Sequence, residues 1–159
     1  MRIQVLGAVV LASVCLAQPL LAADSTSVAV MVSAQFSSRV SLRVSNDVLR
    51  FAVAAPDQAT TMAVDFSAAA RTQAGAEVLL SVEALSGVAG PAGPSNLEPS
   101  VSFAGEGAGT LGGALSSAGA TVAGRWTGSG LRHGRIVFAF NAAEPGVYTV
   151  PVRFVLSAP

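Results

Sequence analysis

A glycine-rich stretch, residues 107–112, matches the pattern Gly-x-Gly-x-x-Gly. That pattern binds dinucleotides where it joins a strand to a helix, because the glycines let the backbone approach a pyrophosphate at the helix N-terminus. The fingerprint also needs an acidic residue about 20 positions later for the ribose. No Asp or Glu stands between Glu106 and Glu144, and no helical periodicity follows the glycines. The stretch is therefore predicted to be a flexible loop, and no cofactor is expected.

The other side chains with catalytic chemistry do not form a recognisable set. His133 is the only histidine, and no Gly-x-Ser-x-Gly elbow provides a nucleophile beside it; we expect it at a hairpin tip. Glu77 and Glu83 share the solvent face of one expected strand, whereas glycosidase carboxylates oppose each other across a cleft. Cys15 is the only cysteine, which excludes a thiolate metal cluster. We therefore expect no catalytic residue, no metal site and no enzyme.

Charge and aromatic residues give one candidate ligand surface. The nine basic residues are all arginine, nine acidic residues balance them, and this lack of a basic surplus argues against nucleic-acid binding. Trp126 is the only tryptophan. A Trp ring stacks on sugars and cations, yet a single Trp in a β-sandwich is commonly a core residue. Both interpretations stay open, and the surface interpretation groups Trp126 with Arg125, Arg132 and Arg135.

The N-terminus has the order of a secretory signal peptide. Arg2 precedes an apolar run, residues 5–17, which Gln18 and Pro19 end ahead of small residues. We expect cleavage after Ala22 or Ala23, which assigns residues 1–22 to the signal peptide and residues 23–159 to one exported domain. A retained membrane anchor is the alternative, since the stretch is long enough to span a bilayer.

Beyond the signal peptide, apolar residues recur with a period of two, which indicates half-buried β-strands. The clearest strand is the last one, where Thr149, Pro151 and Arg153 alternate with apolar residues. The apolar residues of the predicted strands are Val40, Leu42 and Val44; Leu49, Phe51 and Val53; Met62, Val64 and Phe66; Val78, Leu80, Val82 and Ala84; Val101 and Phe103; Ile136, Phe138 and Phe140; and Tyr148, Val150, Val152, Phe154 and Leu156.

These strands predict an all-β fold, an immunoglobulin-like antiparallel β-sandwich of about seven strands. A small barrel is the alternative. Residues 86–100 and the Gly/Ala-rich residues 105–124 are expected to be loops, and residues 68–71 to form one helical turn. Pro151 lacks an N–H, so we expect an edge or a bulge there.

The alternating segment directly after the signal peptide is the most informative feature of the sequence. An ordinary first strand would read this way, and so would a donor strand that adds to the open sheet edge of a neighbouring subunit. In the second interpretation the strand lies within residues 26–36. Its apolar side chains would bind the partner, and they are Val28, Val30, Val32, Ala34 and Phe36.

Three patches favour the donor interpretation. Residues 26–34, residues 96–105 with Leu97-Glu98-Pro99 before a strand, and residues 145–156 with Gly146-Val147-Tyr148 before the last strand follow one another in order. Together they resemble the major fimbrial subunits of the alternate chaperone–usher pathway, the colonisation-factor type. The Gly/Ala-rich residues 105–124 have no counterpart in that pattern.

The resemblance implies a structural fimbrial or pilus subunit that polymerises by donor-strand exchange. Its partners would be identical neighbouring subunits, together with a periplasmic chaperone and an outer-membrane usher. Its location would be the periplasm and then the cell surface. The rival hypothesis is a monomeric secreted β-sandwich module that binds a glycan or another ligand.

Overall fold

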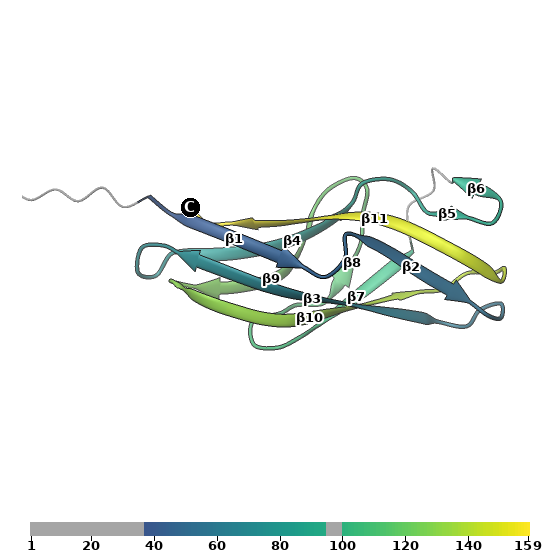
Figure 1. Ribbon diagram of the computed structural model, residues 1–159, viewed down its shortest axis with the longest axis horizontal. Helices are drawn as coiled ribbons and strands as arrows, with labels where there is room; N and C mark the ends of the chain where they lie inside the picture. The colour runs from purple at the N-terminus through teal and green to yellow at the C-terminus, as the bar shows by residue number, and fades with distance from the viewer. Residues whose placement is uncertain (1–36, 95–99) are drawn as a thin grey trace, which may run out of the picture. The chain divides into compact units, whose positions relative to one another are not determined.

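The computed structural model describes residues 37–94 and 100–159. The chain divides into two units, Met1–Ala34 and Gln35–Pro159, and the whole first unit lies outside the described residues. The second unit is all-β in its described part, with strands β1 to β11 in two antiparallel sheets (Figure 1). Among the described residues no helix is long and apolar enough to span a membrane.

The first sheet has the strand order β1-β3-β10-β7-β8. β3 and β10 form its centre over eleven aligned pairs, from Thr60 opposite Phe140 to Ala70 opposite Gly130. β1 pairs only with β3 and forms one edge. The strand bounds are β1 Arg39–Val44, β3 Thr60–Arg71, β7 Val101–Glu106, β8 Gly113–Ala114 and β10 Gly130–Phe140.

The second sheet has the order β6-β5-β11-β4-β9, and β2 also pairs with β11. β11 pairs with β2 along its first half and with β4, on its other side, along its second half, which matters for the site below. The strand bounds are β2 Val48–Val53, β4 Glu77–Ala84, β5 Ala89–Gly90, β6 Gly93–Pro94, β9 Thr121–Thr127 and β11 Gly146–Ser157.

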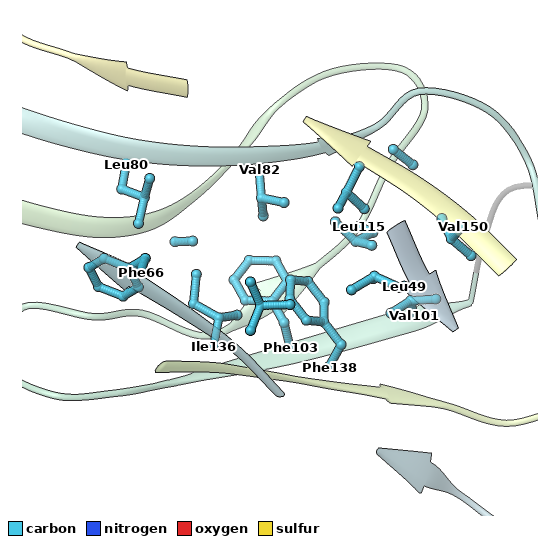
Figure 2. Packing of buried hydrophobic residues seen from close by; sticks show 14 of the residues in the cluster. Leu49, Phe66, Leu80, Val82, Val101, Phe103, Leu115, Ile136, Phe138 and Val150 are labelled. Atoms are coloured by element: carbon cyan, nitrogen blue, oxygen red, sulfur yellow. The ribbon is translucent and has the colours of Figure 1, made fainter. Parts of the chain in front are cut away.

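Alternation of side chains builds the core between the sheets. Along β2 and β4 every second residue is buried, as the period-two pattern predicts. Figure 2 shows Phe66, Ile136 and Phe138 of the first sheet pointing toward Leu80 and Val82 of the second. Aromatic pairs tie the layers together, with ring centroids 5.2 Å apart for Phe51 and Phe140. The predicted immunoglobulin-like sandwich is thus confirmed.

Two local predictions were wrong. Residues 68–71 do not form a helical turn but continue β3 to Arg71, because their alternate small side chains pack inward and β1 and β10 pair with them on both sides. His133 does not lie at a hairpin tip. It lies inside β10 opposite Ser67, and the β9–β10 turn falls earlier, at Gly128 and Ser129.

The Gly/Ala-rich residues 105–124, expected to be a loop, contain regular structure. They include β8 and the start of β9, and Leu115 inserts into the core while its N–H donates to the Val101 carbonyl. A Cβ at Gly109 would lie 2.5 Å from the Trp126 ring, so glycine is required for this close packing. No helix follows the glycines among the described residues, so the context of a dinucleotide site is missing.

Burial in the core predicts that two substitutions will lower the free energy of unfolding by very different amounts. Phe138→Ala removes a side chain that is 0% exposed, and it should lower the free energy of unfolding by about 3–5 kcal/mol because a cavity remains. Thr61→Ala, on the exposed face of β3, should change it by no more than about 0.5 kcal/mol. Urea denaturation followed by circular dichroism measures both. Similar losses in the two variants would contradict the core assignment.

Candidate functional site

β11 exchanges hydrogen-bonding partners at Pro151. Before this residue it pairs with β2, from Gly146 opposite Val53 to Pro151 opposite Val48. After it, from Val152 to Ser157, it pairs with β4 on its other side. The edge or bulge expected at Pro151 is not found. The proline lies where β11 changes partner, and it has neighbours on both sides, Val48 and Leu85. No described strand continues the line of β2 beside the second half of β11.

The backbone N–H and C=O groups of a strand point alternately to its two sides. This alternation shows which of these groups lie on the side of β11 that faces away from β4. Leu85 N–H donates to the Pro151 carbonyl on the β4 side, and Val152 N–H donates to the Asp47 carbonyl on the β2 side. Neighbouring residues of a strand alternate in hydrogen-bond direction. The N–H and C=O groups of Phe154 and Leu156 therefore point to the open side. Unpaired groups of this kind are a template for another strand.

The open side of β11 corresponds to one particular strand position of the immunoglobulin-like fold. An immunoglobulin-like sandwich of the constant type has the sheets A-B-E-D and C-F-G. β1, β3, β10 and β7 follow the order of the first sheet, and β4 and β11 take the places of C and F. β2 lies where G would lie beside the first half of β11, and in the described chain nothing takes that place beside the second half.

β1 forms the opposite wall of the opening. It belongs to the first sheet, and its register with β3 leaves its other edge toward β11 unpaired in the described chain. Ser38 Oγ donates to the Pro159 carbonyl at 2.7 Å, so the start of β1 lies beside the end of the chain (Figure 1). β1 and the second half of β11 thus run antiparallel, without a ladder between them.

Apolar side chains line this opening, which we call the β1–β11 groove. A groove of about 400 Å³ is bounded by Leu42, Val44, Asp47, Leu85, Val152, Arg153 and Phe154. Leu42, Val44, Phe154 and Leu156 pack against the core but remain half-exposed, and Val40 at the outer end is 41% exposed. A half-buried apolar lining between two unpaired edges can accept an extended chain with alternating apolar side chains.

The five residues of the predicted donor strand, Val28 to Phe36, lie outside the described residues. Sequence reasoning did not identify the groove they would need. The signal was present in part, because Leu42, Val44, Phe154 and Leu156 were assigned to inward faces, but alternation does not show that β1 and β11 lack a common neighbour.

Trp126 lies in the core. It is 8% exposed, its ring centroid is 5.9 Å from that of Phe66, and its Nε1–H donates to the Ala108 carbonyl at 2.8 Å. This hydrogen bond holds the glycine-rich turn of residues 107–112 against β9. The indole therefore serves packing, and its polar atom is already satisfied.

The three arginines grouped with Trp126 do not share a surface. Arg125 lies on the outer face of the second sheet and forms an ion pair with Glu77 at 3.3 Å. Arg135 lies on the outer face of the first sheet, 2.8 Å from Asp65, and this hydrogen bond and the carboxylate charge raise the pKa of Arg135. Arg132 donates to the Leu131 carbonyl. Arg132 does line one small cavity together with Trp126. Arg125 and Arg135 lie elsewhere, so the four residues do not form the single ligand surface expected from the sequence.

A second cavity, of about 370 Å³, lies at the opposite end of β11. It is open to solvent and is lined by Tyr148, Phe140, Asn141, Glu144 and loop residues around Pro91. The Tyr148 hydroxyl donates to the Glu144 carbonyl, and the ring packs on Phe140 with centroids 5.0 Å apart. Among the described residues no three His, Cys, Asp or Glu side chains gather in a way that could hold a metal ion.

Comparisons of the chain with protein-family models, with curated proteins and with solved structures find no match. The resemblance to fimbrial subunits accordingly rests on the three sequence patches alone.

Burial of Trp126 makes a direct prediction. Because it is the only tryptophan, its fluorescence reports one environment. The emission maximum should be blue-shifted relative to free tryptophan, acrylamide should quench it weakly, and added glycans should leave it unchanged. Emission at the position of free tryptophan, or a shift on addition of a sugar, would place the ring on a binding surface instead.

Proposed function

We propose that the protein is a structural subunit of a surface fibre, and that it polymerises by inserting an N-terminal strand into the β1–β11 groove of the next copy. The single observation that carries the proposal is the edge of β11 at Phe154 and Leu156, which has no partner strand among residues 37–94 and 100–159 and lies above a half-exposed apolar lining. A stable exported monomer would have to cover such an edge to avoid aggregation.

The dimensions of the groove suit the proposed donor. β1 and the free part of β11 each extend over six residues. A strand of that length places three side chains on one face. The sequence offers five alternating apolar residues between Val28 and Phe36. Three of them would fill the groove, and the remainder would bridge to the β1 strand of the subunit that donates.

The short connection favours donation to another copy. Only Ser37 and Ser38 separate Phe36 from Arg39, the first residue of β1. Return of the whole segment 28–36, up to Phe36, into its own groove would require a two-residue hairpin, and these turns strongly favour Gly, Asn or Asp at positive φ. Two serines fit that requirement poorly, whereas an extended connection to a neighbour imposes no such demand.

The resemblance adds further expected partners. In the fimbrial family that the sequence resembles, a periplasmic chaperone and an outer-membrane usher handle the subunit before assembly. Here the apolar β1–β11 groove is the surface that such a chaperone would cover. The alternative, a monomeric secreted binding module, loses its proposed ligand surface because Trp126 is buried and its arginines are dispersed.

Two complementary variants test the proposal. In the full chain, Val30→Asp with Val32→Asp disables the donor, and Leu42→Asp disables the acceptor groove by placing a charge in its apolar lining. Wild type should give multimers that survive SDS without heating and dissociate on boiling, and each variant alone should give monomers. An equimolar mixture of the two variants should give dimers only, because one intact donor and one intact groove remain per pair.

The control is Thr149→Asp, on the outer face of β11 away from the groove, which should polymerise like wild type. Dimers in the mixture would show that the Val30→Asp, Val32→Asp chain still folds, because only a folded chain offers an intact groove to the donor strand of the Leu42→Asp chain. Wild-type monomers under native conditions, or multimers from either single variant, would overturn the proposal.

A further inference from the structure

The cavity at the start of β11 is lined by polar side chains that have no part in the proposed fibre. Its volume of 370 Å³ lies within the range of about 300–1,000 Å³ that is typical of small-ligand sites. It lies between the β10–β11 loop and the β5–β6 hairpin, beside the first part of β11 (Figure 1). We call it the Tyr148 cavity, and the lining residues that matter below are Phe140, Asn141, Glu144 and Tyr148.

Tyr148 forms a fixed aromatic wall of this cavity. It is the outermost of three rings, in which the centroid of Phe140 lies 5.2 Å from that of Phe51 and 5.0 Å from that of Tyr148. The Tyr148 hydroxyl donates to the Glu144 carbonyl at 2.8 Å, so the far end of the side chain is held as well. A Cβ at Gly90 would lie 2.6 Å from Tyr148 Cε1, so glycine allows the β5–β6 hairpin to approach the ring closely. The ring is therefore positioned before any ligand binds.

Two polar side chains accompany the ring. Asn141 directly follows β10, Glu144 lies two residues before β11, and both are exposed. Because the Glu144 carbonyl binds the Tyr148 hydroxyl, the Glu144 carboxylate is kept close to the ring. Within residues 37–94 and 100–159, Glu144 forms no ion pair and the Asn141 side chain forms no hydrogen bond. Both groups are available to a ligand.

The chemistry of these groups matches hydroxyl groups. An amide side chain both donates and accepts hydrogen bonds, whereas a carboxylate only accepts them. Neighbouring hydroxyls of a sugar donate and accept, so they use both side chains at once while the apolar face of the sugar packs on the aromatic ring.

Other small ligands fit the cavity less well. A quaternary ammonium ion also packs on aromatic rings, but it has no N–H for the carboxylate and no use for the amide. Neither arginine nor histidine occurs among the described residues that line the cavity, so an anionic sugar would meet the Glu144 charge without compensation.

We infer that the Tyr148 cavity binds a neutral sugar residue of a glycan. The inference does not depend on the proposed fibre, because no described residue lines both this cavity and the β1–β11 groove. In a polymer the cavity would recur once per subunit, and the linked sites would raise the avidity for a surface that carries many copies of the glycan.

The test uses the only tyrosine of the chain as the probe. The full chain with ¹³C-labelled tyrosine is titrated with methyl α-glucoside, methyl α-mannoside and methyl β-galactoside, and the ring signals of Tyr148 are followed by NMR. At least one glycoside should shift them saturably, with a dissociation constant of about 1 mM, as expected for so small a ligand. Failure of all three to give a saturable shift at about 20 mM would overturn the inference.

A pair of matched variants locates the binding. Asn141→Ala with Glu144→Ala should weaken it at least tenfold, because both polar partners are lost while the main-chain carbonyl that holds Tyr148 remains. The control is Asp57→Gly with Gln58→Ala, which removes a carboxylate and an amide from the exposed β2–β3 loop outside the cavity. Glycine suits the φ of 57° at Asp57. The control should bind within about twofold of wild type, and Trp126 emission verifies that both variants fold.

Two further probes test the ligand class. A methyl sialoside, which carries a carboxylate, should bind at least tenfold more weakly than the best neutral glycoside. Tetramethylammonium chloride should give no saturable shift of the Tyr148 signals. The inference is also overturned if either probe binds as tightly as the best neutral glycoside, or if both double variants lose binding equally.

Discussion

The second half of β11, which in the described chain has a neighbouring strand on one side only, is the constraint from which the organisation of the molecule follows. Backbone N–H and C=O groups must find partners, and a long strand satisfies only those groups that have a neighbour on each side. β2 supplies these partners up to Asp47, and the residues that precede Asp47 lie in the first sheet as β1. This crossing from β1 to β2 gives the first sheet an additional edge strand, and within the described residues it leaves Phe154 and Leu156 with unpaired edge groups. The groove, its apolar lining and the proposed polymer all derive from it.

β1 combines two surfaces because a strand presents opposite faces with a period of two. Its inward residues lie between the core and the groove, and its outward residues face solvent. A change of one residue in its register with β3 would exchange these two sets of side chains. The same ladder that closes one side of the core therefore also determines which side chains of β1 line the groove.

Alternation in the sequence was sufficient to predict the fold class and most inward residues, as β2, β4 and β11 show. It failed where side-chain size carried no contrast. Residues 68–70 are alanines and therefore small on both faces, so their strand was not recognised, and the sheet neighbours of β10 were needed to place His133 within a strand. The groove escaped prediction for another reason. Alternation distinguishes the two faces of a strand, but it does not specify which strand lies beside which.

The placement of Leu115 has a consequence for how this sequence can vary. It anchors a Gly/Ala-rich excursion near its middle, so two short loops replace one long one, and each short loop has a lower closure entropy cost. A Cβ at Gly113 would lie 2.9 Å from the Phe103 ring, and one at Gly119 would meet nothing within 4 Å. Glycine positions that look alike in this low-complexity stretch therefore differ in how much space surrounds them. Insertions and substitutions should accumulate around Gly119 in related chains, while Gly109, Gly113 and Leu115 stay constant.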